Sequence, residues 1–336
     1  MRRAAPSQGF SRLFDDARPP GYAALEEQWT FDPARHLAME QPARVYDLEE
    51  LGYTRAQIAE CPSSLAITTP FRLLSEEGAK ALLQVTRQLE VHATSTARIP
   101  RMVRGGVYRS RFLHDLCNCP ILAEFFSDMA ATTLLPHTMP LQLGHINYQP
   151  DDIARATDKW HWDGVGFDYV VMPSDPAALE GGAFVWFKGT KKEGISLLEK
   201  DGDIVGDKRV ECSFAQPGFA IFQQGNMVLH RVNKLTTPAE RITMVNAYIS
   251  PNVHFEDVSR FKDLQEADPA FVLNSEWARH KAWISRTKIE QLLANLPYTT
   301  DKTFIIRELE HVISDIQGAI EDISSSGEAK GIYFGD

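Results

Sequence analysis

The segment Lys159-Trp-His161-Trp-Asp163-Gly164 decides the organisation of this chain, together with His230, which lies 66 residues beyond Gly164. In an extended strand, side chains at positions i and i+2 point to the same face. His161 and Asp163 can therefore reach one metal ion from one edge of a β-barrel. His230, in the middle of a later strand-like run, can complete the site from the facing sheet. Two imidazoles and one carboxylate on one face of an octahedron form the preferred site for non-haem Fe(II), with three coordination positions left open.

Short runs of β-branched and aromatic residues surround this motif. They begin near residue 138 and are separated by Gly, Pro and Asp clusters, which is typical of antiparallel β folds. We expect strands over residues 141–149, 169–172, 183–187, 219–223, 227–232 and 241–249. The chain is therefore predicted to be mainly β with flanking helices, built around a central double-sheeted barrel.

Helical periodicity precedes and follows the strands. Ser75 and the two glutamates after it predict a helix start, and apolar spacing continues that helix to about residue 91. Further helices are expected over 112–135, 275–294 and 303–323. The predicted organisation of residues 1–336 is a single domain, with an irregular N-terminal arm (1–70) holding one or two short helices, a helical layer (71–137), a β core (138–252) and C-terminal helices (253–336). The C-terminal helices are expected to form either a homodimer contact or a cover for the barrel.

Arg241 lies eleven residues beyond His230, across a turn at Thr237-Pro238-Ala239. This spacing predicts a hairpin that places Arg241 on the strand next to that of His230. Arg241 and Thr243 share a face by the same i, i+2 rule. A guanidinium and a hydroxyl that point into an apolar barrel make a specific receptor for a carboxylate. An unpaired arginine there would be costly, so an acidic ligand is implied.

Composition limits the partners of the chain. Its 336 residues are 43% hydrophobic and carry a net charge of −10, from 35 Lys plus Arg and 45 Asp plus Glu. The negative electrostatic field of such a chain disfavours binding to nucleic acid, whose phosphates are also negative. No apolar run reaches the roughly 20 residues of a membrane span, and the N-terminus lacks the apolar segment of a signal peptide. The four cysteines fit thiols in a reducing compartment, so we expect a cytoplasmic protein that binds a small-molecule substrate.

The order His-x-Asp, distal His and Arg-x-Thr resembles that of the Fe(II)/2-oxoglutarate-dependent dioxygenase superfamily. Members fold as a double-stranded β-helix, or cupin-like jelly roll, with helices outside, and the resemblance covers roughly residues 138–250. It implies that His161, Asp163 and His230 hold Fe(II), and that Arg241 and Thr243 bind the distal carboxylate of 2-oxoglutarate. The cofactors implied are Fe(II), 2-oxoglutarate and O₂.

Two further motifs carry the same resemblance. Residues 180–189 resemble the glycine-rich strand of the family, although Lys188-Gly189 stands where Pro-Gly is usual. Gln216-Pro217-Gly218 and the strand after it resemble the segment that precedes the distal His. Halogenating relatives have a small residue in the place of Asp163, which leaves room for chloride. The resemblance therefore implies hydroxylation or desaturation rather than halogenation.

Two features of the sequence suggest residues that line a substrate pocket: the alternation of side chains along the predicted strands, and a loop rich in arginine. His145 and Asn147 alternate on their predicted strand, so they line either the barrel interior or a polar outer face. Trp162, Phe184 and Trp186 are aromatic candidates for a dry lining, with ordinary core packing as the alternative. Arg104 belongs to an arginine-rich loop over 98–111, which forms either a substrate lid with Gly105-Gly106 or a solvated loop with scattered ion pairs.

Three functions are compatible with these residues. The first is a 2-oxoglutarate-dependent oxygenase that oxidises an unactivated C–H bond of an amino acid or natural-product intermediate and releases succinate and CO₂. The second is an iron oxidase or dioxygenase of similar fold that does not use 2-oxoglutarate, against which Arg241 and Thr243 argue. The third is a non-catalytic ligand-binding barrel. A buried His–His–Asp cluster without a metal would carry a desolvation cost, which argues against it.

Overall fold

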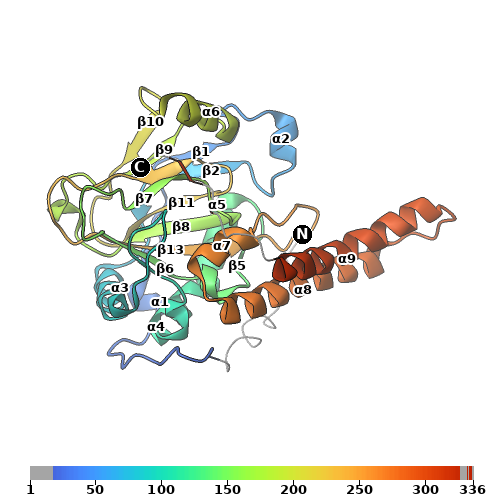
Figure 1. The fold of residues 1–336 in the computed structure, drawn as a ribbon, viewed down its shortest axis with the longest axis horizontal. Coiled ribbons are helices and arrows are strands. Elements are labelled where there is room, and N and C mark those ends of the chain that lie inside the picture. The colour runs from blue at the N-terminus through green and yellow to red at the C-terminus, as the bar shows by residue number, and fades with distance from the viewer. Residues whose placement is uncertain (1–17, 326–330, 332, 335–336) are drawn as a thin grey trace.

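The computed structural model describes residues 18–325, 331 and 333–334, and within them two antiparallel sheets are flanked by helices (Figure 1). The larger sheet has nine strands. Seven follow the spatial order β1 (Val45–Asp47), β2 (Leu65–Thr68), β11 (Phe219–Gln223), β8 (Phe167–Met172), β13 (Ile242–Ile249), β6 (His145–Tyr148) and β4 (Met102–Val103). Two short strands join them at the side: β3 (Phe71–Arg72) pairs with β11, and β5 (Leu135–Pro136) pairs with β13.

The smaller sheet has four strands in the order β10 (Arg209–Cys212), β9 (Phe184–Phe187), β12 (His230–Val232) and β7 (Asp158–His161). Side chains along β9 alternate between its two faces. Phe184 and Trp186 pack in one buried cluster with residues of β8 and β11, so this face of the small sheet meets the large sheet. Val185 and Phe187 pack in another, together with residues of α6 (Lys191–Asp201). The sheets therefore enclose a core between them.

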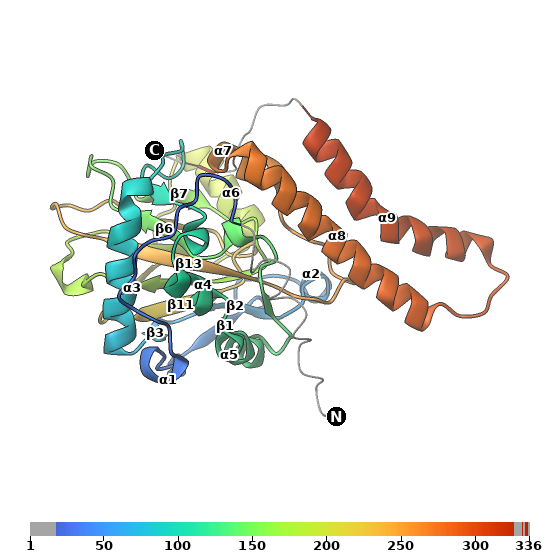
Figure 2. The ribbon, with the colours of Figure 1, turned by 90° about the horizontal axis from the view of Figure 1, so that it is seen from below.

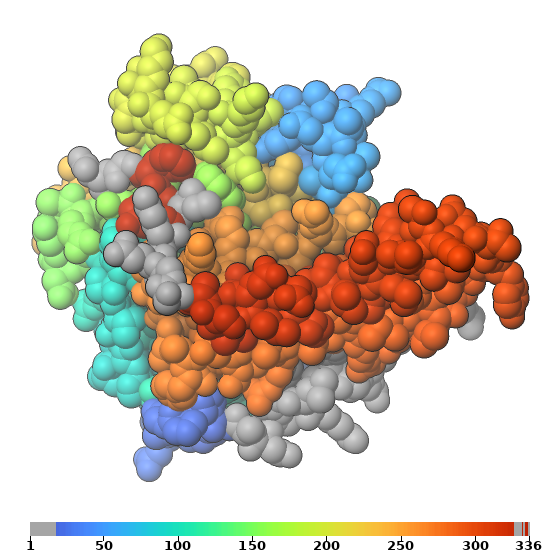
Figure 3. Space-filling model, turned by 45° about the vertical axis from the view of Figure 1, so that its right-hand side comes forward, coloured from blue at the N-terminus to red at the C-terminus, as the bar shows by residue number. Residues whose placement is uncertain are grey.

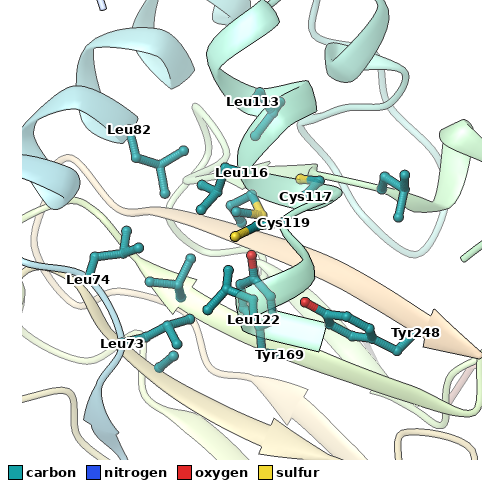
Figure 4. Packing of buried hydrophobic residues seen from close by; sticks show 14 of the residues in the cluster. Leu73, Leu74, Leu82, Leu113, Leu116, Cys117, Cys119, Leu122, Tyr169 and Tyr248 are labelled. Atoms are coloured by element: carbon teal, nitrogen blue, oxygen red, sulfur yellow. The ribbon is translucent and has the colours of Figure 1, made fainter. Parts of the chain in front are cut away.

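Three helices cover the outer face of the large sheet: α3 (Glu76–Leu89), α4 (Arg111–Cys117) and α5 (Pro120–Ala130). The Ser75 hydroxyl caps α3 by accepting a hydrogen bond from the Gly78 amide. Leucines of α3 and α4 meet Tyr169 and Tyr248 of the sheet in one buried cluster, which also holds Cys117 and Cys119 (Figure 4). Among the described residues all four cysteines are free thiols.

A long helical hairpin, α8 (Ala270–Asn295) and α9 (Lys302–Ser324), extends away from the sheets (Figure 2). The short α7 (Phe261–Ala267) leads into it. Buried polar contacts fix α8 to the core, because the Asp257 carboxylate accepts hydrogen bonds from His280 Nε2 at 2.9 Å and from Lys281 Nζ. In the described part of the chain, no helix is both long enough and apolar enough to cross a bilayer.

The strand positions predicted near residues 169–172, 183–187, 219–223 and 241–249 are confirmed, and so are the helices near 75–91, 275–294 and 303–323. The helical stretch predicted over 112–135 consists of two helices, because Pro120 lacks an amide hydrogen and begins a new helix, and it ends earlier than predicted, at Ala130. The arm predicted to be irregular holds α1 (Pro33–His36) and α2 (Arg55–Ala59), but also β1 and β2, and β2 is an integral part of the large sheet. The expectation that the N-terminus is not a signal peptide concerns residues 1–17, which lie outside the described residues.

Candidate metal and 2-oxo acid site

His161, Asp163 and His230 converge at the inner side of the small sheet. Each offers one ligand atom, and these atoms all lie within 4.8 Å of one another. The Asp163 carboxylate lies 3.4 Å from His161 Nε2 and 3.3 Å from His230 Nε2, and the two imidazole centroids are 4.2 Å apart. Both histidines are buried. This donor set suits a divalent transition metal and leaves positions for further ligands.

His230 was expected to approach from the facing sheet, and that expectation is wrong. Strands β7 and β12 are antiparallel neighbours in the small sheet, and His230 pairs directly with His161. Paired residues on adjacent strands point to the same face, which brings the two imidazoles together. Asp163 lies just beyond the end of β7, where its amide donates a hydrogen bond to the Gly225 carbonyl at 3.0 Å.

Backbone carbonyls orient both imidazoles. His161 Nδ1 donates to the Lys159 carbonyl at 2.7 Å, and His230 Nδ1 donates to the Val228 carbonyl at 3.0 Å. A histidine whose Nδ1 carries the proton presents Nε2 as a lone-pair donor. Both rings are therefore held as metal ligands through Nε2, the atoms that face Asp163.

Burial and mutual proximity set the charges of this cluster. Burial lowers the pKa of His230 to about 4, assisted by the neighbouring His161. Burial alone would raise the pKa of Asp163, but His230 and His161 outweigh it and hold that pKa well below its usual range. An ionised carboxylate beside a neutral imidazole is the protonation state that metal binding requires.

Asp168 and Gln223 support Asp163, although nothing in the sequence drew attention to them. Gln223 Nε2 donates to Asp163 Oδ2 at 3.3 Å and to Asp168 Oδ1 at 3.0 Å. Asp168 is fully buried, and burial, reinforced by the charge of Asp163, raises its pKa well above the ordinary value. Gly225 closes over both carboxylates: a Cβ there would lie 2.2 Å from Asp168 Oδ2 and 2.5 Å from Asp163 Oδ2. Only glycine fits at this position.

Arg98 and Asp158 form a second support that the sequence did not reveal. The Arg98 guanidinium makes a bidentate pair with Asp158 at 2.8 and 3.0 Å, and its Nη2 lies 2.9 Å from His161 Nε2. Burial would raise the pKa of Asp158, but Arg98 and His161 lower it. A cation is therefore held at the open side of the metal site, where it can meet an anionic ligand.

Arg241 is 1% exposed, and its guanidinium has two nitrogens without a protein partner. Nε donates to the Gly182 carbonyl at 2.8 Å, whereas Nη1 and Nη2 make no hydrogen bond. Burial lowers the pKa of Arg241 to about 10. A buried guanidinium with two free donors in a fixed fork fits a carboxylate ligand, so the residues present suit a 2-oxo acid as well as a metal. Thr243, two residues on, is also buried.

The predicted hairpin between His230 and Arg241 is wrong. The strand that follows Arg241 is β13, which lies in the large sheet, whereas β12 lies in the small sheet. The intervening turn therefore carries the chain from one sheet to the other. Arg241 nevertheless reaches the small sheet, because its Nε donates to the carbonyl of Gly182, two residues before β9.

The predicted pocket residues divide into two groups. A cavity opens beside Asp163, and of the six candidates only His145 and Arg104 line it. His145 Nε2 is buried without a hydrogen-bond partner, and burial lowers the pKa of His145 to about 3. Arg104 makes a bidentate ion pair with Asp268 at 2.6 and 2.8 Å, and both side chains are nearly fully buried.

The other four candidates lie away from this cavity wall. Asn147 is buried on β6 with its side-chain oxygen unpaired. Phe184 stacks on the His230 ring at 5.3 Å, and Trp186 packs against Tyr46 in the core between the sheets. Trp162 is partly buried and lies beneath two cations, Lys191 Nζ at 5.0 Å and Arg260 at 5.6 Å from its ring centre.

Comparison with known proteins gives one family match. The model of the family described as Halogenase D matches residues 52–265, which is more than half of the chain. No curated protein sequence matches.

Several solved structures are similar at low identity. EctD from S. alaskensis with 2-oxoglutarate and 5-hydroxyectoine is 14% identical, with 70% of this chain and 93% of that chain covered and a TM-score of 0.43. The non-haem α-ketoglutarate-dependent carbocyclase SnoK of nogalamycin biosynthesis is 14% identical (63% and 87% covered, TM-score 0.42), and the epimerase SnoN of the same biosynthesis is 18% identical (52% and 72% covered, TM-score 0.38). Because the family model matches more than half of the chain, the chain belongs to the Halogenase D family, and it carries the His–Asp–His set of metal-ligand side chains that the sequence predicted.

Proposed function

We propose that this enzyme oxidises an unactivated C–H bond of a small molecule, with iron held by His161, Asp163 and His230. Arg241 and Thr243 would hold the distal carboxylate of 2-oxoglutarate. The observation that carries the proposal is the buried Arg241 fork, whose Nε is fixed on the Gly182 carbonyl while its two remaining nitrogens have no protein partner. A structural arginine would be expected to have protein partners for those donors.

The cofactors supply the redox chemistry. When bound, the iron and 2-oxoglutarate activate O₂, with release of succinate and CO₂. The protein provides orientation and charge. Lys159 and Val228 carbonyls fix the imidazoles, Gln223 and Gly225 fix the Asp163 carboxylate, and burial of the site excludes water from the reacting centre.

Hydroxylation or desaturation is favoured over halogenation, despite the description of the family. Asp163 places a carboxylate within 3.4 Å of both Nε2 atoms, at the position that a halide would need. Gln223 and Gly225 hold that carboxylate in place, so it is not free to swing aside. Halogenation remains the second candidate because of the family match.

The cavity beside Asp163 supports a small polar substrate of the amino-acid or natural-product class. Its walls carry Arg98, which pairs with Asp158, and Arg260, which pairs with Asp263, together with Glu266. Groups of both signs in one cavity suit a ligand with both a cationic and an anionic group.

The eight strands from β6 to β13 support a double-stranded β-helix. Strands β6, β8, β11 and β13 lie in the large sheet, and β7, β9, β10 and β12 lie in the small sheet. Two antiparallel four-stranded layers of this kind make a jelly roll. We also propose a cytoplasmic location, which the four free thiols support.

The experiment is an anaerobic absorption titration of metal-free protein with Fe(II) and then with 2-oxoglutarate. A weak visible charge-transfer band that needs both additions is the expected result, and succinate release with a panel of small substrates then identifies the reaction. Iron binding without the band would favour an oxidase that does not use 2-oxoglutarate. Failure to bind iron would contradict the metal assignment and favour a non-catalytic barrel. Adding chloride to the substrate assay distinguishes halogenation from hydroxylation or desaturation. A chlorinated product would overturn the inference that the Asp163 carboxylate occupies the place of a halide.

A further inference from the structure

The helix α9 exposes a regular line of large apolar side chains. They are Ile306, Leu309, Ile313, Ile316, Ile320 and Ile323, here called the α9 seam, and each is between 38% and 60% exposed. Their spacing alternates between three and four residues from end to end. That alternation is the a/d pattern of a coiled coil, in which the line of apolar residues contacts another helix.

The α9 seam is separate from the line by which α9 contacts α8. Val312 and Ala319 are buried against α8, and Asp315 and Asp322 pair there with Lys288 Nζ at 2.6 Å and Trp277 Nε1 at 3.1 Å. At about 100° per residue, the seam lies roughly 110° around the helix from this contact line. The seam therefore lies on a side of α9 that α8 does not cover.

Exposed apolar residues of α8 extend the same surface. Ile289 follows the buried His280 by nine residues, and Leu293 follows the buried Ile284 by nine. Nine residues correspond to two and a half turns of an α-helix, so each exposed residue lies on the opposite side of α8 from the buried one. Ile289 is 43% exposed and Leu293 is 80% exposed, so both point away from the core. Figure 3 shows the two helices running side by side across the surface and beyond the core. Antiparallel neighbours with these phases present the α9 seam and these two α8 residues on one face of the hairpin.

We propose that this face binds the same face of a second copy of the chain, so that two hairpins form an antiparallel four-helix contact. The spacing of the α9 seam reads the same in both directions. An antiparallel pair therefore sets Ile306 against the partner's Ile323, Leu309 against the partner's Ile320, and Ile313 against the partner's Ile316. A self-complementary patch of this kind is what a two-fold interface requires.

The exposed apolar area favours a second copy as the occupant, and the charge of α9 argues against a membrane surface. Eight large apolar side chains that are about half exposed present several hundred Å², which approaches the roughly 800 Å² that each partner contributes to a stable interface. A membrane surface is disfavoured, because helices that lie on membranes carry Lys and Arg on their polar face. The polar positions of α9 are mainly acidic: Glu308, Glu310, Asp315, Glu321 and Asp322 against Lys302 and Arg307.

A parallel pairing of two α9 helices is less suited to the residues beside the α9 seam. In a parallel coiled coil, charged residues beside the a/d line form the ion pairs that set the register. On one flank of the α9 seam those places are taken by Val312 and Ala319, which are buried against α8. The two-fold axis is therefore expected to cross α9 near its middle, between Ile313 and Ile316.

Sedimentation velocity on the full chain tests the proposal. The wild type should be a dimer, and Ile313→Glu or Ile320→Glu should raise the dimer dissociation constant at least a hundredfold. Ser314→Glu is the matched control, because it adds the same charge at an exposed position off the seam and should leave the dimer intact. Unchanged helical circular dichroism in each variant separates loss of the contact from loss of the fold.

Several results would overturn the proposal. A monomeric wild type at every concentration would do so, and so would a dimer that survives both glutamate variants. A monomer in which hydrogen exchange along the α9 seam accelerates only when residues 1–17 are removed would show that the chain's own N-terminus is the occupant. Mixing Leu309→Cys with Ile320→Cys under oxidation should give a heterodimeric disulfide; cross-linking of each variant only with itself would refute the antiparallel arrangement.

Discussion

Replacing Arg241 with methionine should stabilise the protein without cofactors and weaken its binding of 2-oxoglutarate. The guanidinium is buried with two unpaired nitrogens, and burial lowers its pKa from 12.5 to about 10. At 1.36 kcal/mol per pKa unit, this corresponds to a desolvation cost of about 3 kcal/mol. Methionine removes that cost but leaves the Gly182 carbonyl without its donor, which costs about 1 kcal/mol. The variant should therefore gain about 2 kcal/mol in its free energy of unfolding.

The loss of ligand affinity follows from the same two nitrogens. A carboxylate bound by both would lose two charge-assisted hydrogen bonds, each worth about 1.5 kcal/mol, so the dissociation constant of 2-oxoglutarate should rise roughly a hundredfold. Urea unfolding, with and without Fe(II) and 2-oxoglutarate, measures both effects. Arg101→Met serves as a control, because Arg101 pairs with Glu90 and Asp151 at the surface and should not alter ligand affinity.

One result would refute this reasoning directly. If Arg241→Met lowered the stability of the cofactor-free protein and left 2-oxoglutarate affinity unchanged, Arg241 would be a structural residue with partners that the geometry does not show. The carboxylate assignment would then fail, and the charge expected to bind the 2-oxo acid would have to come from another residue.

Three further changes test the site and its surroundings. His230→Ala should abolish tight Fe(II) binding in an equilibrium titration while leaving the far-ultraviolet circular dichroism unchanged; retained affinity would contradict the metal assignment. Gly225→Ala places a Cβ 2.5 Å from the Asp163 carboxylate and should weaken metal binding at least tenfold, whereas Gly318→Ala, with open space around it, should raise the melting temperature slightly. Burial raises the pKa of Glu276 to about 7, so its protonated form stabilises the fold, and that stability is present below about pH 4.5 and is lost as the pH rises through 7. Glu276→Gln should remove a pH-dependent change of about 3 kcal/mol from urea unfolding; an unchanged pH profile would show that Glu276 ionises normally.

The sequence was informative where the signal is local. Ser75 and the apolar spacing behind it predicted α3 correctly, because capping and helical period act within a few residues. The His161–Asp163 pair and the distal His230 were recognisable by their order and by the strands around them. Their closeness in space follows from the pairing of β7 with β12, which no local pattern determines.

Contacts between distant residues escaped prediction. Arg98 and Asp158 are 60 residues apart, and Gln223 and Asp168 are 55 apart, so neither pair leaves a mark on the sequence around it. Strand β2 was missed because it is four residues long and follows a proline-rich stretch. A short strand of this kind is stabilised by its neighbours in the sheet rather than by its own propensity.

The walls of the cavity beside Asp163 come from segments as far apart in the sequence as Thr96 and Gly331. The three metal-ligand side chains lie between residues 161 and 230, whereas Asp263, Glu266 and Gly331 follow them. Ribosomal synthesis proceeds from the N-terminus, and a domain generally folds as a unit once its chain has emerged. The nascent chain therefore presents its metal ligands before the last walls of the cavity have been made.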